Sequence, residues 1–175
     1  MILSLFRKNT ATKPVFAVYN AIVAQSRQPR LYAEWGVPDT VTGRFDMISL
    51  HMTLLFRRLR ARDGAPHDFS QAVFDLFFKD MDRQLREMGS GDIGVPKRIQ
   101  KMGKLFFGLL ATVNDALDNN DVAALEALLI RNIYGEEGAE HAPKLAQYVI
   151  AQYDGLAKQS VDAIIAGNID LGVVA

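Results

Sequence analysis

A helix with apolar residues on two sides is predicted at residues 40–62, and this pattern narrows the choice of fold sharply. At about 100° per residue, one apolar stripe comprises Val41, Phe45, Ile48, Met52, Leu55, Phe56 and Leu59. A second stripe, on the far side, comprises Met47, Leu50 and Leu54. A surface helix buries one stripe, so a helix with two stripes needs neighbours on two sides. We therefore expect the helix at 40–62 to lie at the centre of a helical bundle.

The rest of the sequence also follows helical spacing, without sustained alternation of apolar and polar residues. Further helices are expected at 14–28, 31–36, 67–87, 96–117, 122–134, 143–156 and 160–166. We predict an all-α fold, a single-domain bundle of about seven helices around the central helix at 40–62. Residues 13–175 form this domain because no linker divides them, and residues 1–12 form a loose N-terminal leader.

The start of the central helix is expected to carry a cap and a close backbone contact. Asp39 or Thr40 can cap the helix, since a side-chain oxygen there accepts a hydrogen bond from a free backbone N–H. Gly43 follows inside the first turn, where glycine lowers the helix propensity. A glycine at this position indicates that another backbone packs closely against it.

Composition narrows the functional classes. Twenty basic and twenty acidic residues cancel in this chain of 175, so no overall field attracts DNA or an acidic membrane. The absence of cysteine excludes disulfides and thiolate chemistry. No apolar run reaches the ~18 residues that span a bilayer, and the leader is too short for a secretory signal. We expect a cytoplasmic protein, and the apolar start of the leader leaves a peripheral membrane contact open.

The motifs of common catalytic and metal sites are missing. His51, His67 and His141 lie in different elements, and none has a second ligand at the spacing of a zinc site. The glycines at 89–94 lack the Lys-Ser/Thr pair that a phosphate-binding loop needs. We predict no catalytic residue, no metal and no cofactor. One enzymatic alternative stays open, a small helical enzyme with a polar pocket near His51.

Polar residues on the central helix are candidates for binding. Arg44, His51, Arg58 and Arg62 follow one another between the two apolar stripes. Charged groups on an otherwise buried helix need partners, either inside the fold or on another molecule. Asp46, or acids of a neighbouring helix, are the internal alternative for the arginines. A structural, hydrogen-bonded histidine is the corresponding alternative for His51.

Three further groups have both a structural and a functional interpretation. Tyr32 and Trp35, which precede a turn at 36–39, are either core residues or a binding ledge. The phenylalanines at 74, 77 and 78 are either core or a groove for another protein. Lys97 and Lys101 begin a basic line, continued at 104, on the polar face of their helix. Because cations at a helix N-terminus oppose the helix dipole, this line also fits an acidic partner.

Two long motifs carry a family resemblance. One is GVPDTVTGRFD at 36–46, continued by LHMTLLFRRLR at 50–60, and the other is FKDMDRQLREMGSGDIGVPKRIQKM at 78–102. Together they resemble the ubiquinol–cytochrome c chaperone family, whose members assemble the respiratory cytochrome bc1 complex. The resemblance implies a non-catalytic, all-α protein that binds newly made cytochrome b, with the ribosome or a small partner protein as further contacts. Because no mitochondrial presequence precedes the motifs, the bacterial type is expected.

A chaperone for a hydrophobic membrane protein needs a shaped, semi-polar surface and no reaction centre. We place this surface, as a hypothesis, on segment 32–46, the basic residues of the central helix and the facing region 80–101. The residues proposed to contact the client are Tyr32, Trp35, Asp39, Arg44, Asp46, His51, Arg57, Arg58, Asp80, Lys97 and Lys101. The main alternative is a helical module that binds RNA or the ribosome through the same basic residues, although the neutral net charge counts against it.

Overall fold

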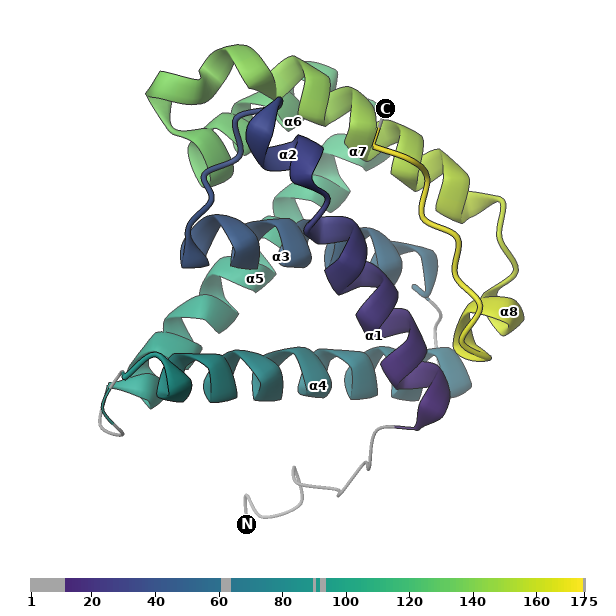
Figure 1. Cartoon of the computed structure of the whole chain (residues 1–175). Coiled ribbons are helices and arrows are strands. Elements are labelled where there is room, and N and C mark those ends of the chain that lie inside the picture. Colours follow the sequence, from purple (N-terminus) through teal and green to yellow (C-terminus); the bar gives the residue numbers. More distant parts are fainter. Residues whose placement is uncertain (1–11, 61–63, 90, 92–93, 175) are drawn as a thin grey trace.

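The computed structural model describes residues 12–60, 64–89, 91 and 94–174, which contain helices and no strand. The α-helices (Figure 1) are α1 Lys13–Ser26, α2 Pro29–Ala33, α3 Val41–Arg58, α4 Ala65–Glu87, α5 Val95–Asp118, α6 Val122–Leu129, α7 Ala142–Ala157 and α8 Val161–Ile165. The all-α prediction is confirmed. Of the predicted leader only Thr12 falls within the described residues, and Arg62 lies outside them.

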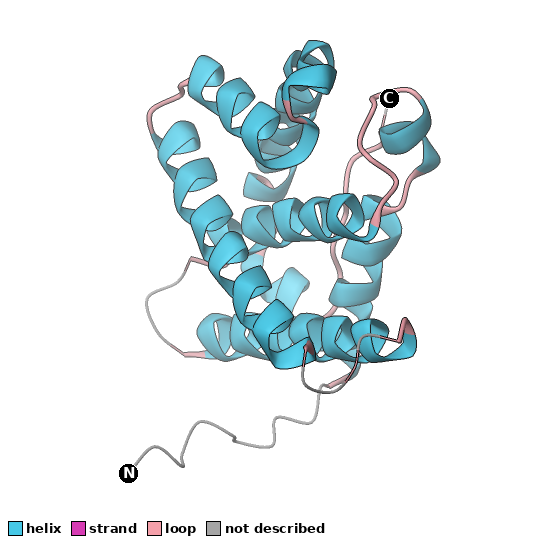
Figure 2. Ribbon diagram, turned by 90° about the vertical axis from the view of Figure 1, so that its left-hand side faces the viewer, coloured by secondary structure: helices cyan, strands magenta, loops and turns pink. Residues whose placement is uncertain are grey.

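Helix α3 passes through the middle of the molecule, between two hydrophobic clusters (Figures 1 and 2). Its stripe of Met47, Leu50 and Leu54 packs with residues of α5, α6 and α7. The opposite stripe packs with residues of α1, α4 and α5, through Phe45, Ile48, Met52, Leu55 and Leu59. Fully burying one such side chain stabilises a fold by roughly 1.5–3 kcal/mol. Helix α3 therefore joins the two halves of the core, as its double pattern predicts.

Local departures from the expected helices occur at element ends. Val41 is 45% exposed, because it is the first residue of α3 and the clusters begin four residues later at Phe45. The helix expected at 122–134 changes character after Leu129, and Ile130–Tyr134 form a π-helical turn, η1. The Gly135 N–H closes this turn on the Ile130 carbonyl at 2.7 Å. The loop expected at 136–141 is a short 3-10 helix, η2, at Glu136–His141.

The start of α3 is closed by the predicted cap and the predicted backbone contact. The Thr40 hydroxyl oxygen accepts a hydrogen bond from the Gly43 N–H at 3.0 Å. A Cβ added at Gly43 would lie 2.0 Å from the Pro38 carbonyl oxygen. The carbonyl belongs to the preceding turn, which the Thr40 N–H also bonds at 2.8 Å. Glycine is therefore required here by space, and its contact sets the angle at which the chain enters α3.

The aromatic residues of α4 belong to the core, with one open edge. The Phe77 ring is fully buried and stacks on the Phe45 ring, with centroids 5.5 Å apart. Phe74 and Phe78 are half-buried, and their centroids lie 4.6 Å apart. Phe74 also lies 5.5 Å from the ring of Phe107 on α5, which is 55% exposed. The structural interpretation holds for Phe77, while the outer rings leave an apolar edge between α4 and α5.

We predict that Gly43→Ala lowers the free energy of unfolding by about 1–3 kcal/mol, because the new methyl group must push the Pro38 carbonyl away. Gly108→Ala is the matched control, since Gly108 is exposed on α5 and has open space around it. The control is expected to stabilise the protein by up to about 1 kcal/mol through helix propensity. Urea unfolding of both variants measures the difference, and equal effects would contradict the account of Gly43.

Candidate functional site

The clearest polar hollow lies where α1 ends and α3 begins. It has a volume of about 610 Å³ and is lined by Arg27, Pro29, Tyr32, Ala33, Asp39 and Arg44. The Arg44 guanidinium donates to the Asp39 carboxylate at 2.8 Å, and both side chains are more than half exposed. Asp39 holds the pKa of Arg44 above its usual range, and Arg44 lowers that of Asp39. The Tyr32 hydroxyl donates to the Ser26 carbonyl at 2.6 Å, which fixes the ring at the wall.

A second hollow follows the contact of α1 with α4 and has a volume of about 470 Å³. Its floor includes Phe16 and Tyr19 of α1, and its charged rim includes Asp80 and Arg83 of α4. Asp80 accepts hydrogen bonds from the Tyr19 hydroxyl at 2.8 Å and the Gln84 amide at 2.9 Å, and it pairs with Arg83. Burial and the neighbouring Asp80 carboxylate raise the pKa of Tyr19 well above its usual range. Tyr19 therefore stays a neutral donor.

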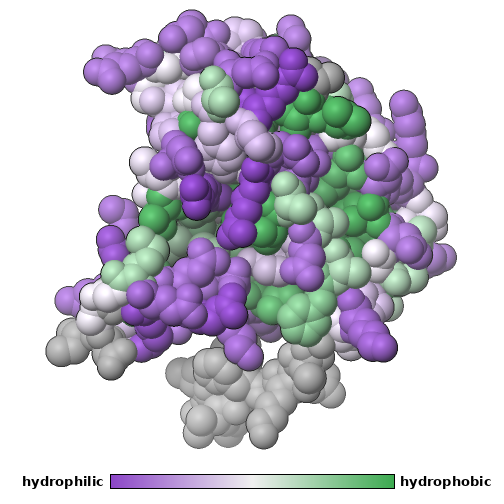
Figure 3. All heavy atoms as spheres, viewed as in Figure 1, coloured by the Kyte–Doolittle hydropathy of each residue, from purple (hydrophilic) through white to green (hydrophobic). Residues whose placement is uncertain are grey.

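Arg27 lines both hollows, so they lie next to each other near the end of α1. We call the two neighbouring hollows together the front-face groove and define it by Phe16, Tyr19, Arg27, Tyr32, Asp39, Arg44, Asp80 and Arg83. Figure 3 views the molecule from the side of Figure 1, and on that side apolar side chains are interspersed with hydrophilic ones. The lining of the groove includes both arginines and aromatic rings, so it offers charged hydrogen-bond donors next to apolar surface.

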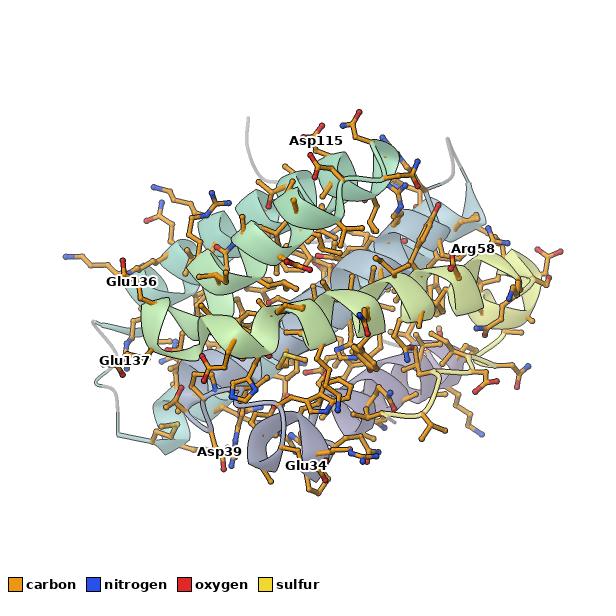
Figure 4. All side chains as sticks on the ribbon, turned by 90° about the horizontal axis from the view of Figure 1, so that it is seen from above. Glu34, Asp39, Arg58, Asp115, Glu136 and Glu137 are labelled. Atoms are coloured by element: carbon orange, nitrogen blue, oxygen red, sulfur yellow. The ribbon has the colours of Figure 1, made fainter. Side chains whose placement is uncertain are left out.

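Arg57 and Arg58 stand at the other end of α3, about 21 Å from Arg44 at 1.5 Å per residue. Figure 4 shows Arg58 and Asp39 at opposite ends of the bundle. The Arg57 guanidinium lies 2.7 Å from the Asp118 carboxylate and 4.8 Å from the centre of the Tyr153 ring. Arg58 donates to the Leu156 and Gln159 carbonyls at 2.6–3.1 Å. A cation at the last carbonyls of α7 is favourable for that helix end.

These arginines therefore have partners inside the fold, where Arg57 ties α3 to α5 and Arg58 ties it to α7. Both still line a shallow shelf of about 330 Å³ with Arg60, Tyr153 and Ala157. Lys97 and Lys101 are exposed on the first half of α5. Neither lysine lines the front-face groove. The predicted surface is thus not one patch: Tyr32, Asp39, Arg44 and Asp80 share the groove, and the other exposed members lie elsewhere.

Trp35 and His51 are each only 2% exposed, so they lie beneath the surface. The Trp35 ring packs edge-on against Tyr148, with centroids 5.5 Å apart, and Lys144 lies over its outer face at 5.0 Å. His51 Nδ1 lies 2.7 Å from the Met47 carbonyl oxygen, which can only accept, so Nδ1 carries the proton. Burial lowers the pKa of His51 to about 4, so the ring is neutral at pH 7.

The neutral His51 ring belongs to a buried chain of hydrogen bonds that the sequence did not reveal. The Tyr148 hydroxyl donates to the bare His51 Nε2 at 2.7 Å, and the Gln25 amide donates to the Tyr148 oxygen at 2.8 Å. The Ser26 hydroxyl lies 3.0 Å from His51 Nδ1. These groups come from α1, α3 and α7, which are far apart in the sequence. The chain gives His51 partners on both ring nitrogens, which is the structural role foreseen as its alternative.

Asp46 is a predicted site residue whose negative charge is disfavoured by burial. Its carboxyl is mostly buried and has no hydrogen-bond or ion-pair partner among the described residues. Burial raises the pKa of Asp46 to about 7, so the group is half neutral near that pH. Neither Arg44 nor Arg58 pairs with Asp46 in the described part, so the internal partner proposed for those arginines is not the one observed.

The described residues also bear on metals and membranes. No group of three or more His, Asp or Glu side chains among them could hold a metal ion. None of the helices formed by the described residues is long and apolar enough to cross a bilayer.

Comparison with known proteins gives the class and then the family. A family model described as ubiquinol-cytochrome C chaperone matches residues 33–171. The crystal structure of the Cbp3 homolog from Brucella abortus is 44% identical, with a TM-score of 0.86, and the match covers 99% of this chain and 98% of that chain. A comparison with curated proteins finds no significant match. These matches define an all-α chaperone, and the chain belongs to the ubiquinol–cytochrome c chaperone family.

We predict that Tyr148→Phe lowers the free energy of unfolding by about 1–3 kcal/mol, because it leaves buried His51 Nε2 and a Gln25 N–H without a partner. Tyr134→Phe is the control, since the Tyr134 hydroxyl is buried without a partner among the described residues. That change is expected to be neutral or stabilising. Thermal unfolding at pH 7 compares the two variants, and a larger loss in Tyr134→Phe would contradict this account.

A second prediction concerns pH. The pKa of Asp46 is raised from 3.8 to about 7 in the folded protein. The folded state therefore binds the proton more tightly than the unfolded chain, and stability is lost as pH rises through 4 to 7. Asp46→Asn removes this loss. Relative to the unaltered protein, the variant should gain roughly 2–4 kcal/mol between pH 4 and pH 8. Urea unfolding across that range measures the gain, and parallel pH profiles would show that Asp46 titrates normally.

Proposed function

We propose that the protein binds newly made cytochrome b and holds it until it enters the cytochrome bc1 complex. The observation that carries the proposal is family membership over residues 33–171 of the 175. The 44% identity to the Cbp3 homolog of Brucella abortus over nearly the whole of both chains supports it. A binder of an incomplete state stabilises that state until assembly removes it. No chemical step is needed for this role.

The front-face groove is the client surface in this proposal. Arg27 and Arg44 present guanidinium groups next to Tyr32, and Phe16 adds an aromatic ring that is 45% exposed. Guanidinium groups and aromatic rings together suit a client segment where polar loops meet an apolar helix end. The adjoining Asp80 carboxylate is bonded to Tyr19, Gln84 and Arg83, so it fixes this part of the groove wall. Lys97 and Lys101 supply a second, separate contact on α5.

The remaining predicted residues act from below in this proposal. Trp35 and His51 support the groove through the core, while Arg57 and Arg58 hold α3 against α5 and α7. Asp46 is mostly buried on α3, two residues after the exposed Arg44, so it is near the groove but largely shielded from a client. We further propose that the protein works at the cytoplasmic face of the inner membrane as a peripheral protein, where it meets its client during synthesis.

The two other functions have less support. An enzyme with a pocket near His51 would need an open site there, but both ring nitrogens of His51 are engaged within the core. A module that binds RNA or the ribosome would use the arginines on phosphates. The neutral net charge disfavours such binding, and its affinity would fall steeply with salt. Client binding through mixed polar and apolar contacts should respond only weakly to salt.

Deletion of the gene, followed by measurement of assembled cytochrome bc1 and crosslinking to nascent cytochrome b, tests the function. We expect loss of that complex while other respiratory complexes persist. To test the surface, Arg27→Glu combined with Arg44→Glu should reduce cytochrome b capture at least tenfold at unchanged helicity. Arg131→Glu with Lys158→Glu is the control, since both residues are exposed outside the groove. Normal cytochrome bc1 in the deletion strain would refute the function, and equal capture by both double variants would refute the surface.

A further inference from the structure

The segment after α8, residues 168–174, is held by side chains along its backbone. It returns outside any helix between α1 and α7 (Figures 1 and 4). The Gln159 side chain donates to the Asp170 carbonyl at 2.7 Å and accepts from the Asp170 N–H at 2.8 Å. Gln152 does the same at Gly172, donating at 2.9 Å and accepting at 3.2 Å. Gln25 donates to the Gly172 carbonyl at 2.6 Å.

This pattern is the one by which a strand recognises a neighbouring strand. A glutamine amide carries one acceptor and two donors, so it can bond the N–H and the C=O of the same residue. Asp170 and Gly172 are two residues apart, so in an extended chain their N–H and C=O groups face the same side. Gln152 lies on α7, and Gln159 lies two residues after the last residue of that helix, Ala157. These glutamine side chains bond only backbone N–H and C=O groups of the segment, so the contacts do not depend on the identity of most of its side chains.

We call the space that residues 168–174 occupy beside Gln25, Gln152 and Gln159 the channel, and it also holds particular side chains. Ile169 and Leu171 are half-buried and pack against both hydrophobic clusters, and Val174 is 7% exposed. Asp170 and Val173 point to solvent. The channel therefore accepts apolar residues at 169, 171 and 174 and tolerates any residue at 170 and 173.

The space for a side chain is smaller at Gly172 than at the neighbouring positions. A Cβ at this position would lie 3.0 Å from the Gln152 amide nitrogen, which is closer than ordinary contact. The preferred ligand therefore has glycine there, between two apolar positions.

The Gln25 amide is held by the core as well as by residues 168–174. With those residues in place, Gln25 and Gln152 are 8% and 3% exposed, and a buried amide is costly unless it is hydrogen-bonded. Gln25 is also bound to the Tyr148 hydroxyl, which is bound to His51 in the core. Its amide is thereby aimed into the channel. Preorganisation of this kind raises affinity because less side-chain freedom is lost on binding.

We propose that the channel formed by Gln25, Gln152 and Gln159 is a binding site for an extended apolar peptide segment of a client, and that residues 168–174 occupy it as an internal ligand. A client segment with the spacing apolar-x-apolar-Gly-x-apolar displaces this tail. The inference rests on the proposed function only in naming the client as the source of the segment. It adds a second site, across α1 from the front-face groove. This site binds backbone groups of the client, whereas the groove offers charged side chains.

The test uses the full chain and a synthetic peptide with the sequence of residues 168–174. Leu171→Asp weakens the tail without altering the channel walls, so this variant should bind the peptide at least tenfold more tightly than the unaltered chain. Adding Gln152→Ala should remove that gain. Adding Gln147→Ala is the matched control, since Gln147 is exposed on the same helix. Fluorescence anisotropy of the labelled peptide measures all four proteins.

Three altered peptides test the mode of recognition. Replacing the N–H of the Gly172 equivalent by an ester oxygen removes one hydrogen bond, and should weaken binding about three- to tenfold. Exchanging the apolar residues among themselves, with the glycine kept, should change affinity less than threefold, because the backbone is what the glutamines read. A peptide with leucine in place of the glycine should bind more weakly than either.

Hydrogen exchange keeps the test decisive if Leu171→Asp does not fold. In the unaltered chain, excess peptide must speed exchange at the Asp170 and Gly172 amides and leave α4 unchanged. The inference is overturned if no peptide concentration does so, or if Gln152→Ala and Gln147→Ala act alike. Failure here leaves the cytochrome b proposal standing on the front-face groove. Conversely, intact cytochrome bc1 in the deletion strain would refute that proposal and leave peptide binding untouched.

Discussion

Burial of α3 on two opposite sides is the constraint from which the rest of the structure follows. Each stripe of the helix fills a separate cluster, one shared with α1 and α4 and the other with α6 and α7, while α5 contributes to both. The C-terminal end of α3 is fixed by Arg57 on α5 and Arg58 on α7. The N-terminal turn carries Arg44, whose side chain is more than half exposed and lines the front-face groove.

A row of hydrogen-bonded polar side chains, His51, Tyr148 and Gln25, crosses the core beside α3. His51 meets Tyr148, Tyr148 meets Gln25, and Gln25 reaches the backbone of Gly172. His51, Tyr148 and Gln25 each have a hydrogen-bond partner. Networks whose members are all bonded in this way fix one arrangement of the helices around them. The row thus aligns α1, α3 and α7 and at the same time sets the position of the last described residues. A change at His51 should be felt at the tail although the two are not in contact.

Local features of the fold were predictable, whereas the partners across the fold were not. The two stripes of α3, the Thr40 cap and the close contact of Gly43 depend on neighbours in sequence, and the structure has all three. The bond from His51 to Tyr148 spans 97 residues, and no spacing rule reaches that far. Arg58 was predicted to contact the client, with a carboxylate as its internal alternative, and its partners inside the fold are carbonyls at the end of α7. Arg27 was missed because only folding brings it between Tyr32 and Asp80.

The central claim, that the groove at the N-terminal end of α3 holds cytochrome b, is tested most directly by site-specific photocrosslinking during synthesis of the client. A photoreactive residue in place of Tyr32 lies in the groove, and one in place of Arg131 lies outside it and is exposed. The account predicts a cytochrome b adduct from position 32 and none from position 131. An adduct from position 131 alone, with both proteins folded, would contradict it.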